Sequence, residues 1–149
     1  ATTATTATNL NGGTVSATTG SFSSTVSTGA LTVTGAITAT GNITAYYSDD
    51  RLKNKLGNIQ NAVEKVTKLN GFYYTANTTA QALGYDTRVE VGVSAQEVES
   101  ILPEIVAPAP IDSKYKTIHY ERLIPLLIEA IKEQQLQIEK LTKIVNERT

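Results

Sequence analysis

Residues 121–147 read ERLIPLLIEAIKEQQLQIEKLTKIVNE, and this stretch decides the fold of the C-terminal part of the chain. Apolar side chains recur in it every seven residues, and a second set stands three places after the first. This heptad pattern is typical of a helix that buries one stripe against partner helices in a coiled coil. The predicted seam is Ile124, Leu127, Ile131, Gln134, Ile138, Leu141 and Val145. We therefore predict a long helix, about 40 Å from end to end, that joins copies of this chain.

The pattern leaves the number of helices in this seam open. Isoleucine at the first heptad position with leucine at the fourth favours a coiled coil of two helices. Gln134 is a polar seam residue that can set the register of the helices, but it favours no particular number of them. The rule therefore predicts an oligomer and does not by itself select a trimer. The alternative is a tail that folds back on its own domain. Pro125 is compatible with the helix because it falls in the first turn.

Charged residues are confined to one part of the chain. The sequence has 13 Lys+Arg and 14 Asp+Glu, and all of them lie in residues 49–149. Residues 1–48 instead contain 15 threonines and 8 alanines. Two bodies with different physical properties therefore share this chain, with a border near Ser48. The chain has no methionine, and we expect it to be a piece of a longer protein.

The uncharged part is a repeat. Glycine recurs every six residues at Gly29, Gly35 and Gly41, and an isoleucine or leucine stands two places after each glycine. Apolar and polar residues alternate between the glycines, which suits short strands. One such strand cannot build a core, but several identical chains wound together can. We predict that residues 1–47 form the end of an intertwined fibrous β stem. A flexible Ser/Thr-rich tether is the alternative.

Residues 48–149 have the size and pattern of a small α/β domain, so the predicted fold class is α+β. Asp49 and Asp50 are expected to cap a short helical turn. Ser94 and Glu97 form a predicted capping box. The expected elements are a helix from Asn58 to Leu69, strands at 72–76, 88–93 and 115–120, a loop or helical excursion at 77–86, a helix at 95–102, and a loop around Pro108 and Pro110.

Composition excludes several classes of function. The chain has no cysteine and one histidine, His119, so disulfides, thiolate catalysis, cysteine zinc sites and multi-histidine metal sites are ruled out. A net charge of −1 argues against a nucleic-acid partner. No apolar run is long enough to span a membrane. We expect no cofactor, no metal and no membrane partner, and we read His119 as structural.

A Ser-Lys dyad is the catalytic design that remains. Ser48 and Lys53 stand five residues apart at the border between the two bodies. On an ideal helix that spacing subtends about 140°, so only a turn can bring them together. A lysine acts as a base only when neutral, which requires burial or neighbouring positive charge. From the residues alone, Ser48-Asp49-Asp50 is a capping cluster.

Four ordered blocks of this chain resemble the endosialidase-type intramolecular chaperone domains of phage tail fibres and tailspikes. The first is Ser48-Asp-Asp-Arg-Leu-Lys53, and the second runs from Asn61 to Tyr74. The third comprises GVSAQEV at 92–98 and LPEIV at 102–106. The fourth is IHYERLIPLLIEAIK at 118–132. The resemblance covers about 48–145 in order.

The resemblance implies a homotrimer whose C-terminal domain folds the fibre and then releases itself by cutting the backbone. Carried onto this chain, the scissile bond is Tyr47–Ser48, Ser48 is the nucleophile and Lys53 the base of a single-turnover serine endopeptidase. The composition border falls at the same bond. The implied location is the virion tail fibre, folded in the host cytoplasm, with the chaperone domain absent from the mature particle after cleavage. The implied partners are two further copies of the chain, the rest of the fibre and, through the mature fibre, a host-cell receptor.

Two other readings stay open at this stage. In one, the domain is a permanent, non-cleaving trimeric fibre tip whose loops at 77–86 and 107–114 touch a receptor. Tyr73, Tyr74, Tyr85 and Tyr115 are then candidates for stacking on sugars. In the other, the chain is a fragment of a bacterial trimeric adhesin, which explains the stem but not the four blocks.

Overall fold

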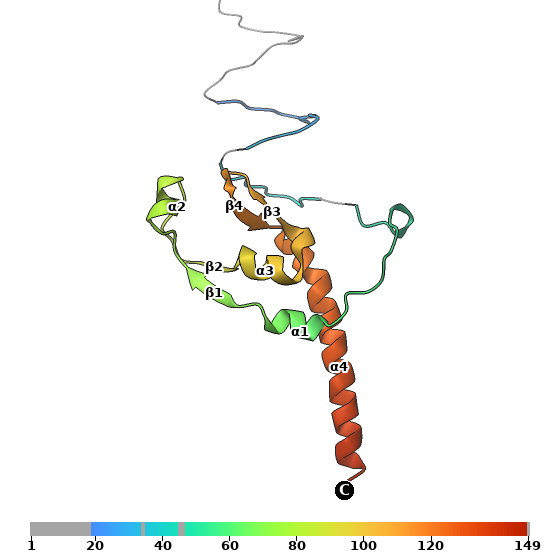
Figure 1. The fold of residues 1–149 in the computed structure, drawn as a ribbon. Helices are drawn as coiled ribbons and strands as arrows, with labels where there is room; N and C mark the ends of the chain where they lie inside the picture. Colours follow the sequence, from blue (N-terminus) through green and yellow to red (C-terminus); the bar gives the residue numbers. More distant parts are fainter. Residues whose placement is uncertain (1–18, 34, 45–46, 149) are drawn as a thin grey trace, which may run out of the picture. The chain divides into compact units, whose positions relative to one another are not determined.

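The computed structural model describes residues 19–33, 35–44 and 47–148. The described chain falls into two units, Ala1–Thr40 and Gly41–Thr149 (Figure 1). The part of the predicted stem at 1–18 lies outside the described residues. Each unit is therefore considered separately.

The described residues of the first unit, 19–33 and 35–40, contain no helix and no strand. Their large apolar side chains are exposed, with Phe22 at 75%, Leu31 at 71% and Ile37 at 68%. A strand needs a neighbour to accept and donate its backbone hydrogen bonds. The intertwined stem requires that neighbour to come from another chain, so it stays a prediction.

The second unit is an α+β body with small sheets and a long C-terminal helix, as the sequence predicted (Figure 1). Its elements in chain order are the 3₁₀ turn η1 (Asp50–Leu52), α1 (Ala62–Thr67), β1 (Gly71–Tyr74), α2 (Thr78–Ala82), β2 (Glu90–Val93), α3 (Ala95–Ile101), η2 (Pro103–Ile105), β3 (Val106–Ala109), β4 (Asp112–Ile118), η3 (Tyr120–Leu123) and α4 (Ile124–Asn146).

Two small hydrophobic clusters hold the second unit together. In the first, Leu126 and Ala130 of α4 pack against Ala62 of α1 and Ile101 of α3. In the second, Val98 of α3 packs with Ile105 and Ile118. The helix face predicted for the region of α1 borders the first cluster through Ile59, Val63, Val66 and Leu69. Helix α4 is therefore part of the core of its own domain as well as a long projecting element.

The four strands found in residues 47–148 form two antiparallel pairs, β1 with β2 and β3 with β4. Tyr73 lies opposite Val91 in the first pair. The expected loop around Pro108 is wrong, because Val106–Ala109 is a strand with an irregular register after Pro108. In a two-stranded sheet both strands are edges, and an edge strand tolerates proline because its missing N–H can face outward.

The predicted start of the helix at Asn58 is wrong by four residues. Asn61 adopts a left-handed backbone with φ of 54°, and α1 begins only at Ala62. The cap comes from a distant residue, because the Glu133 carboxylate of α4 accepts hydrogen bonds from the N–H groups of Ala62 and Val63, both at 2.9 Å. A carboxylate at a helix N-terminus satisfies backbone donors that otherwise have no partner.

The predicted capping box at α3 is half correct. The Ser94 hydroxyl accepts from the Glu97 N–H at 3.4 Å, as expected. The Glu97 carboxylate instead accepts two hydrogen bonds from Asn70, from its backbone N–H at 2.9 Å and its side-chain amide at 3.0 Å. Glu97 therefore holds the chain between α1 and β1.

Helix α4 begins at Ile124 with Pro125 in its first turn and ends at Asn146, and the preceding residues form the 3₁₀ turn η3 rather than α-helix. Its 23 residues give a length of about 35 Å. Leu126 and Ala130 face the domain and are buried, whereas the predicted seam lies on another face. The fold-back alternative is thus partly realised, because the first half of α4 packs on its own domain through residues other than the seam.

We predict that Glu133→Gln destabilises the domain at neutral pH and flattens its pH dependence. Hydrogen bonds from Val63 and then Ala62 hold the pKa of Glu133 below its ordinary value. A lowered folded-state pKa means that the stabilisation is complete above the unfolded pKa and is lost as the pH falls through the lowered one. Urea midpoints of both proteins, measured across this acid range at one protein concentration, should therefore converge at low pH.

The matched control is Glu139→Gln, farther along the same helix, where the carboxylate accepts from the Gln135 side chain at 2.8 Å. This variant should keep the wild-type pH dependence. A Glu133→Gln protein with unchanged midpoints at every pH would contradict the role of this carboxylate.

Candidate functional site

The structure places Ser48 and Lys53 on either side of the turn η1. The Asp49 carboxylate caps this turn by accepting from the Arg51 N–H at 2.9 Å. Two backbone bonds of 3.1 Å close it, from Leu52 N–H to the Asp49 carbonyl and from Lys53 N–H to the Asp50 carbonyl. The sequence expectation that a capped turn follows Ser48 is correct, and the turn brings the lysine back toward the serine.

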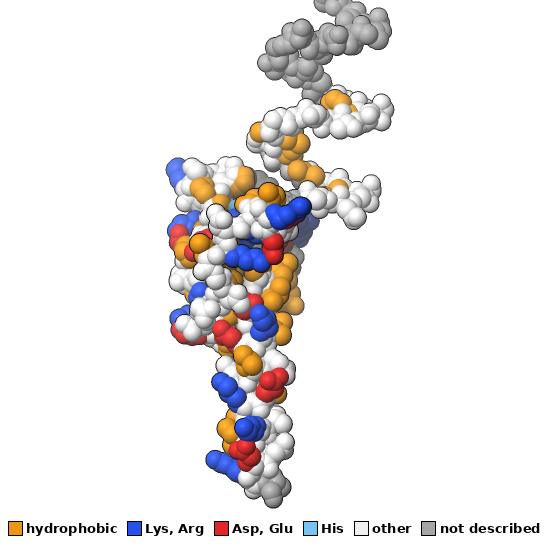
Figure 2. Space-filling view, turned by 90° about the vertical axis from the view of Figure 1, so that its right-hand side faces the viewer, with side chains coloured by type: hydrophobic (Ala, Val, Ile, Leu, Met, Phe, Trp, Pro, Cys, Tyr) orange, Lys and Arg blue, Asp and Glu red, His pale blue; other side chains and the backbone are white. Residues whose placement is uncertain are grey.

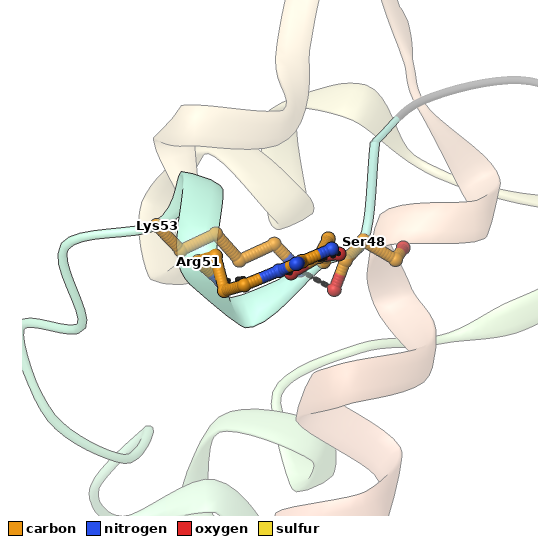
Figure 3. Close-up of polar contacts among 4 residues, drawn as sticks. Ser48, Arg51 and Lys53 are labelled. Atoms are coloured by element: carbon orange, nitrogen blue, oxygen red, sulfur yellow. Dashed lines mark hydrogen bonds and ion pairs between the residues drawn. The ribbon is translucent and has the colours of Figure 1, made fainter.

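The contact between the two residues runs through the serine backbone. Lys53 Nζ donates a hydrogen bond of 3.1 Å to the Ser48 carbonyl oxygen. In Figure 3 the Ser48 side chain extends away from the lysine amine. The two side chains are thus neighbours, but the hydrogen bond between hydroxyl and amine that a nucleophile and its base share is absent from the described contacts. The roles of Ser48 and Lys53 stay predictions.

Two ion pairs lie beside this contact. Arg51 donates to the Asp49 carboxylate from Nε at 3.0 Å and from Nη2 at 2.6 Å, and Lys55 pairs with Asp50 at 2.7 Å. The side-chain hydrogen bond from Arg51 is the main cause that lowers the pKa of Asp49, and the charge of Lys53 adds to it. The sequence analysis gave Arg51 no role beyond its place in the block Ser48-Asp-Asp-Arg-Leu-Lys53. Its position two residues after the capping Asp49 was the signal that could have indicated this ion pair.

The segment that carries the site is open to solvent. Tyr47 is 67% exposed, Leu52 is 66% exposed and Leu56 is fully exposed. Residues 53–59 belong to no helix or strand, and Gly57 adopts a φ of 127°, which glycine alone tolerates easily. Apolar side chains next to the site therefore have no cover from the part of the chain that the structure describes.

The predicted seam of α4 is also uncovered. Its six apolar members are between 45% and 65% exposed, and Gln134 is exposed as well. Figure 2 shows hydrophobic side chains at the surface of this helix among charged ones. The seam residues are Ile124, Leu127, Ile131, Gln134, Ile138, Leu141 and Val145. A row of exposed apolar side chains at heptad spacing is what an oligomer seam requires, and the seam itself stays a prediction.

Two of the four candidate sugar-stacking tyrosines come together. Tyr85 and Tyr115 line one groove of about 520 Å³, together with Ile111 and residues of α2. Tyr73 lies elsewhere, on β1. Tyr74 donates a hydrogen bond of 2.8 Å to Glu90, which raises the pKa of its hydroxyl. Residues 77–86 and 107–114, expected as loops but including α2 and parts of β3 and β4, thus both contribute to one groove.

Other site classes find no support in the described part of the chain. His119 stands at the end of β4, where its N–H donates to the Ile105 carbonyl at 2.9 Å. No group of three or more His, Asp or Glu side chains among the described residues is arranged to hold a metal ion. Among the helices of the described residues, none has the length and hydrophobicity needed to cross a membrane.

Comparison with known proteins confirms the predicted resemblance over part of the chain. Residues 48–107 match the family model Peptidase S74, chaperone of endosialidase. The long tail fibre protein Gp37 of Enterobacteria phage K3 is 37% identical over 98 residues, which cover 63% of this chain and 8% of that protein. Gp37 of phage T2 is 37% identical over 98 residues, or 7% of its length, and Gp37 of phage M1 is 36% identical over 96 residues, or 38% of its length.

Proposed function

We propose, from the match of residues 48–107 to the chaperone of endosialidase family model, that the chain is the end of a phage tail fibre that carries its own folding domain. The match to phage long tail fibre proteins supports this role, although the chain spans less than two fifths of the length of each of these relatives. In this proposal, residues 48–149 trimerise three chains and fold the stem at 1–47. The domain then cuts itself free at Tyr47–Ser48.

The exposed seam of α4 is the observation that carries the assembly step. Six apolar side chains at heptad spacing remain at the surface of a helix whose other face is occupied by its own domain. Burying them against two further copies removes that surface from water, at roughly 25 cal/mol per Å² of apolar area. The helical pattern supports an oligomer, and the choice of three chains comes from the family.

A helical assembly device suits a fibrous stem. Pairing strands between chains is slow and leaves unpaired edges exposed to aggregation. Three chains joined by α4 hold their stems at a high effective concentration and in register. Cutting afterwards removes the registering element and traps the finished stem kinetically.

The proposed cleavage is an acyl shift followed by hydrolysis. The Ser48 hydroxyl oxygen attacks the Tyr47 carbonyl carbon, Lys53 as a neutral amine takes the hydroxyl proton, and this proton passes to the departing Ser48 nitrogen. The C–N bond breaks as the C–O ester bond forms. Water then cleaves the ester, which leaves a carboxylate on Tyr47 and restores the Ser48 hydroxyl on a new amino terminus.

The described geometry supports a resting state of this reaction. Lys53 Nζ donates a hydrogen bond to the Ser48 carbonyl oxygen, within the residue whose hydroxyl and backbone nitrogen take part in the reaction. Rotation of the Ser48 side chain toward the amine is then needed, together with loss of water around an exposed segment. Both changes follow if neighbouring chains cover Leu52 and Leu56, which are uncovered in one chain.

We predict that the wild-type chain yields a fragment that begins at Ser48, whereas Ser48→Ala and Lys53→Ala stay intact. The first variant lacks the nucleophile and the second lacks the base. Intact masses measured after denaturation distinguish the products. Full-length chain in all three proteins would exclude self-cleavage, but it would not contradict the proposed role as a trimerising chaperone.

A second prediction links cleavage to assembly. Ile131→Glu together with Ile138→Glu places charges in the seam, so the chain should become monomeric in sedimentation and should not cut. Leu136 is 57% exposed and lies outside the predicted seam, so Leu136→Glu is the matched control and should assemble and cut. Normal cutting by a proven monomer would refute the coupling.

The groove between α2 and the β3–β4 turn favours one alternative, a permanent fibre tip that binds a receptor. In that case an intact trimer should bind host cells or their glycans. Tyr85→Ala with Tyr115→Ala should then abolish binding, and Tyr73→Ala, away from the groove, should not. Clean cleavage without such binding would exclude this alternative.

A further inference from the structure

The Asp49 carboxylate interacts with two cations of the same turn. Arg51 makes a bidentate contact with it: Nη2 donates to Oδ2 at 2.6 Å and Nε donates to Oδ1 at 3.0 Å. The positive charge of Lys53 helps to lower the pKa of the same carboxylate, while its Nζ donates a hydrogen bond to the Ser48 carbonyl oxygen. The proposed base thus stands near an acid that already has a partner.

This arrangement bears on the chemistry of the proposed cleavage. Lys53 removes a proton only as a neutral amine, and a nearby carboxylate with no other partner would favour the ammonium form. A guanidinium bound in two-pronged fashion saturates the carboxylate. Its own positive charge also disfavours a second cation beside it.

We propose that Arg51 is a positioning residue for self-cleavage, which keeps the Asp49 carboxylate on the turn and away from the amine of Lys53. This inference rests on the proposed function. Asp49 then has one task, to cap the turn that returns Lys53 to Ser48. Arg51 prevents the same carboxylate from holding Lys53 as an ammonium ion.

The other charged groups of the segment are already paired. Asp50 and Lys55 bind each other at 2.7 Å, and no described helix or strand packs extensively against the turn. Asp49 is therefore the carboxylate that Arg51 must occupy. Removing Asp50 and Lys55 together is a matched control, because it deletes a neighbouring ion pair without leaving a carboxylate unpaired.

The test is the rate of cleavage against pH for four chains: wild type, Arg51→Ala, Asp49→Asn with Arg51→Ala, and Asp50→Asn with Lys55→Ala. Cleavage is followed by intact mass on chains whose oligomeric state is checked by sedimentation. Arg51→Ala should cut about tenfold more slowly near neutral pH, with its profile moved about one unit to the alkaline side. The double variant should recover the wild-type profile, because asparagine keeps the cap and has no charge to hold the amine. Asp50→Asn with Lys55→Ala should match the wild type, because it leaves no carboxylate unpaired.

An Arg51→Ala profile identical to that of the wild type would overturn the inference, and so would a double variant as slow as Arg51→Ala. If Arg51→Ala fails to assemble, Arg51→Gln takes its place, since it keeps a hydrogen-bond donor to Asp49 but lacks the charge. A wild-type trimer that never cuts would overturn the proposed cleavage itself, and the inference with it. The inference about Arg51 fails by itself only if the wild type cuts and the variants do not show the expected pH profiles.

Discussion

The carboxylate of Glu133 joins parts of the chain that lie seventy residues apart, and the second unit depends on this contact. It caps α1 through the N–H groups of Ala62 and Val63, directly beside the cluster of Ala62, Leu126 and Ala130. The hydrogen bonds fix the position of α1 along α4, and the apolar contacts stabilise the packing of the two helices. Because Asn61 has a left-handed backbone and its side chain caps nothing, α1 has no cap of its own. Its start is therefore set by α4.

This arrangement gives α4 two separate faces. Leu126, Ala130 and Glu133 lie on the face toward the domain, whereas Ile131 stands about 140° around the helix from Leu126. The domain can therefore occupy one side of the helix without using the seam. Beyond Glu133 every described residue of α4 is exposed, so the C-terminal half of the helix buries no side chain among the described residues of one chain. In the proposed assembly, the folding of one domain and the association of several chains use different side chains of one helix.

The sequence predicted what local pattern determines and missed what distant residues determine. Heptad spacing and Pro125 located α4, and Ser94 located the start of α3, because periodicity and capping are readable over a few residues. The start of α1 was not readable, since its cap is Glu133. Strand β3 was missed because Pro108 argues locally for a loop, while its pairing with β4 comes from across the turn. At the site, the turn after Asp49 was predictable, but the hydrogen bond of Lys53 to the Ser48 carbonyl rather than the hydroxyl was not, because side-chain direction has no signature in sequence.

The exposure of the site and the exposure of the seam have a common consequence. A base that works only when neutral is disfavoured in water and favoured where water is excluded. Among the described residues, nothing covers Leu52 or Leu56, and no helix or strand packs extensively on the turn between Ser48 and Lys53. The proposed cleavage requires water to be excluded from the site. Because the apolar residues beside it are exposed, we expect neighbouring chains to supply the cover. In the proposed mechanism, the hydrophobic energy of assembly and the chemistry of cutting are coupled, because both depend on excluding water from the same residues. The proposal therefore needs no separate switch to delay cleavage until the chains have assembled.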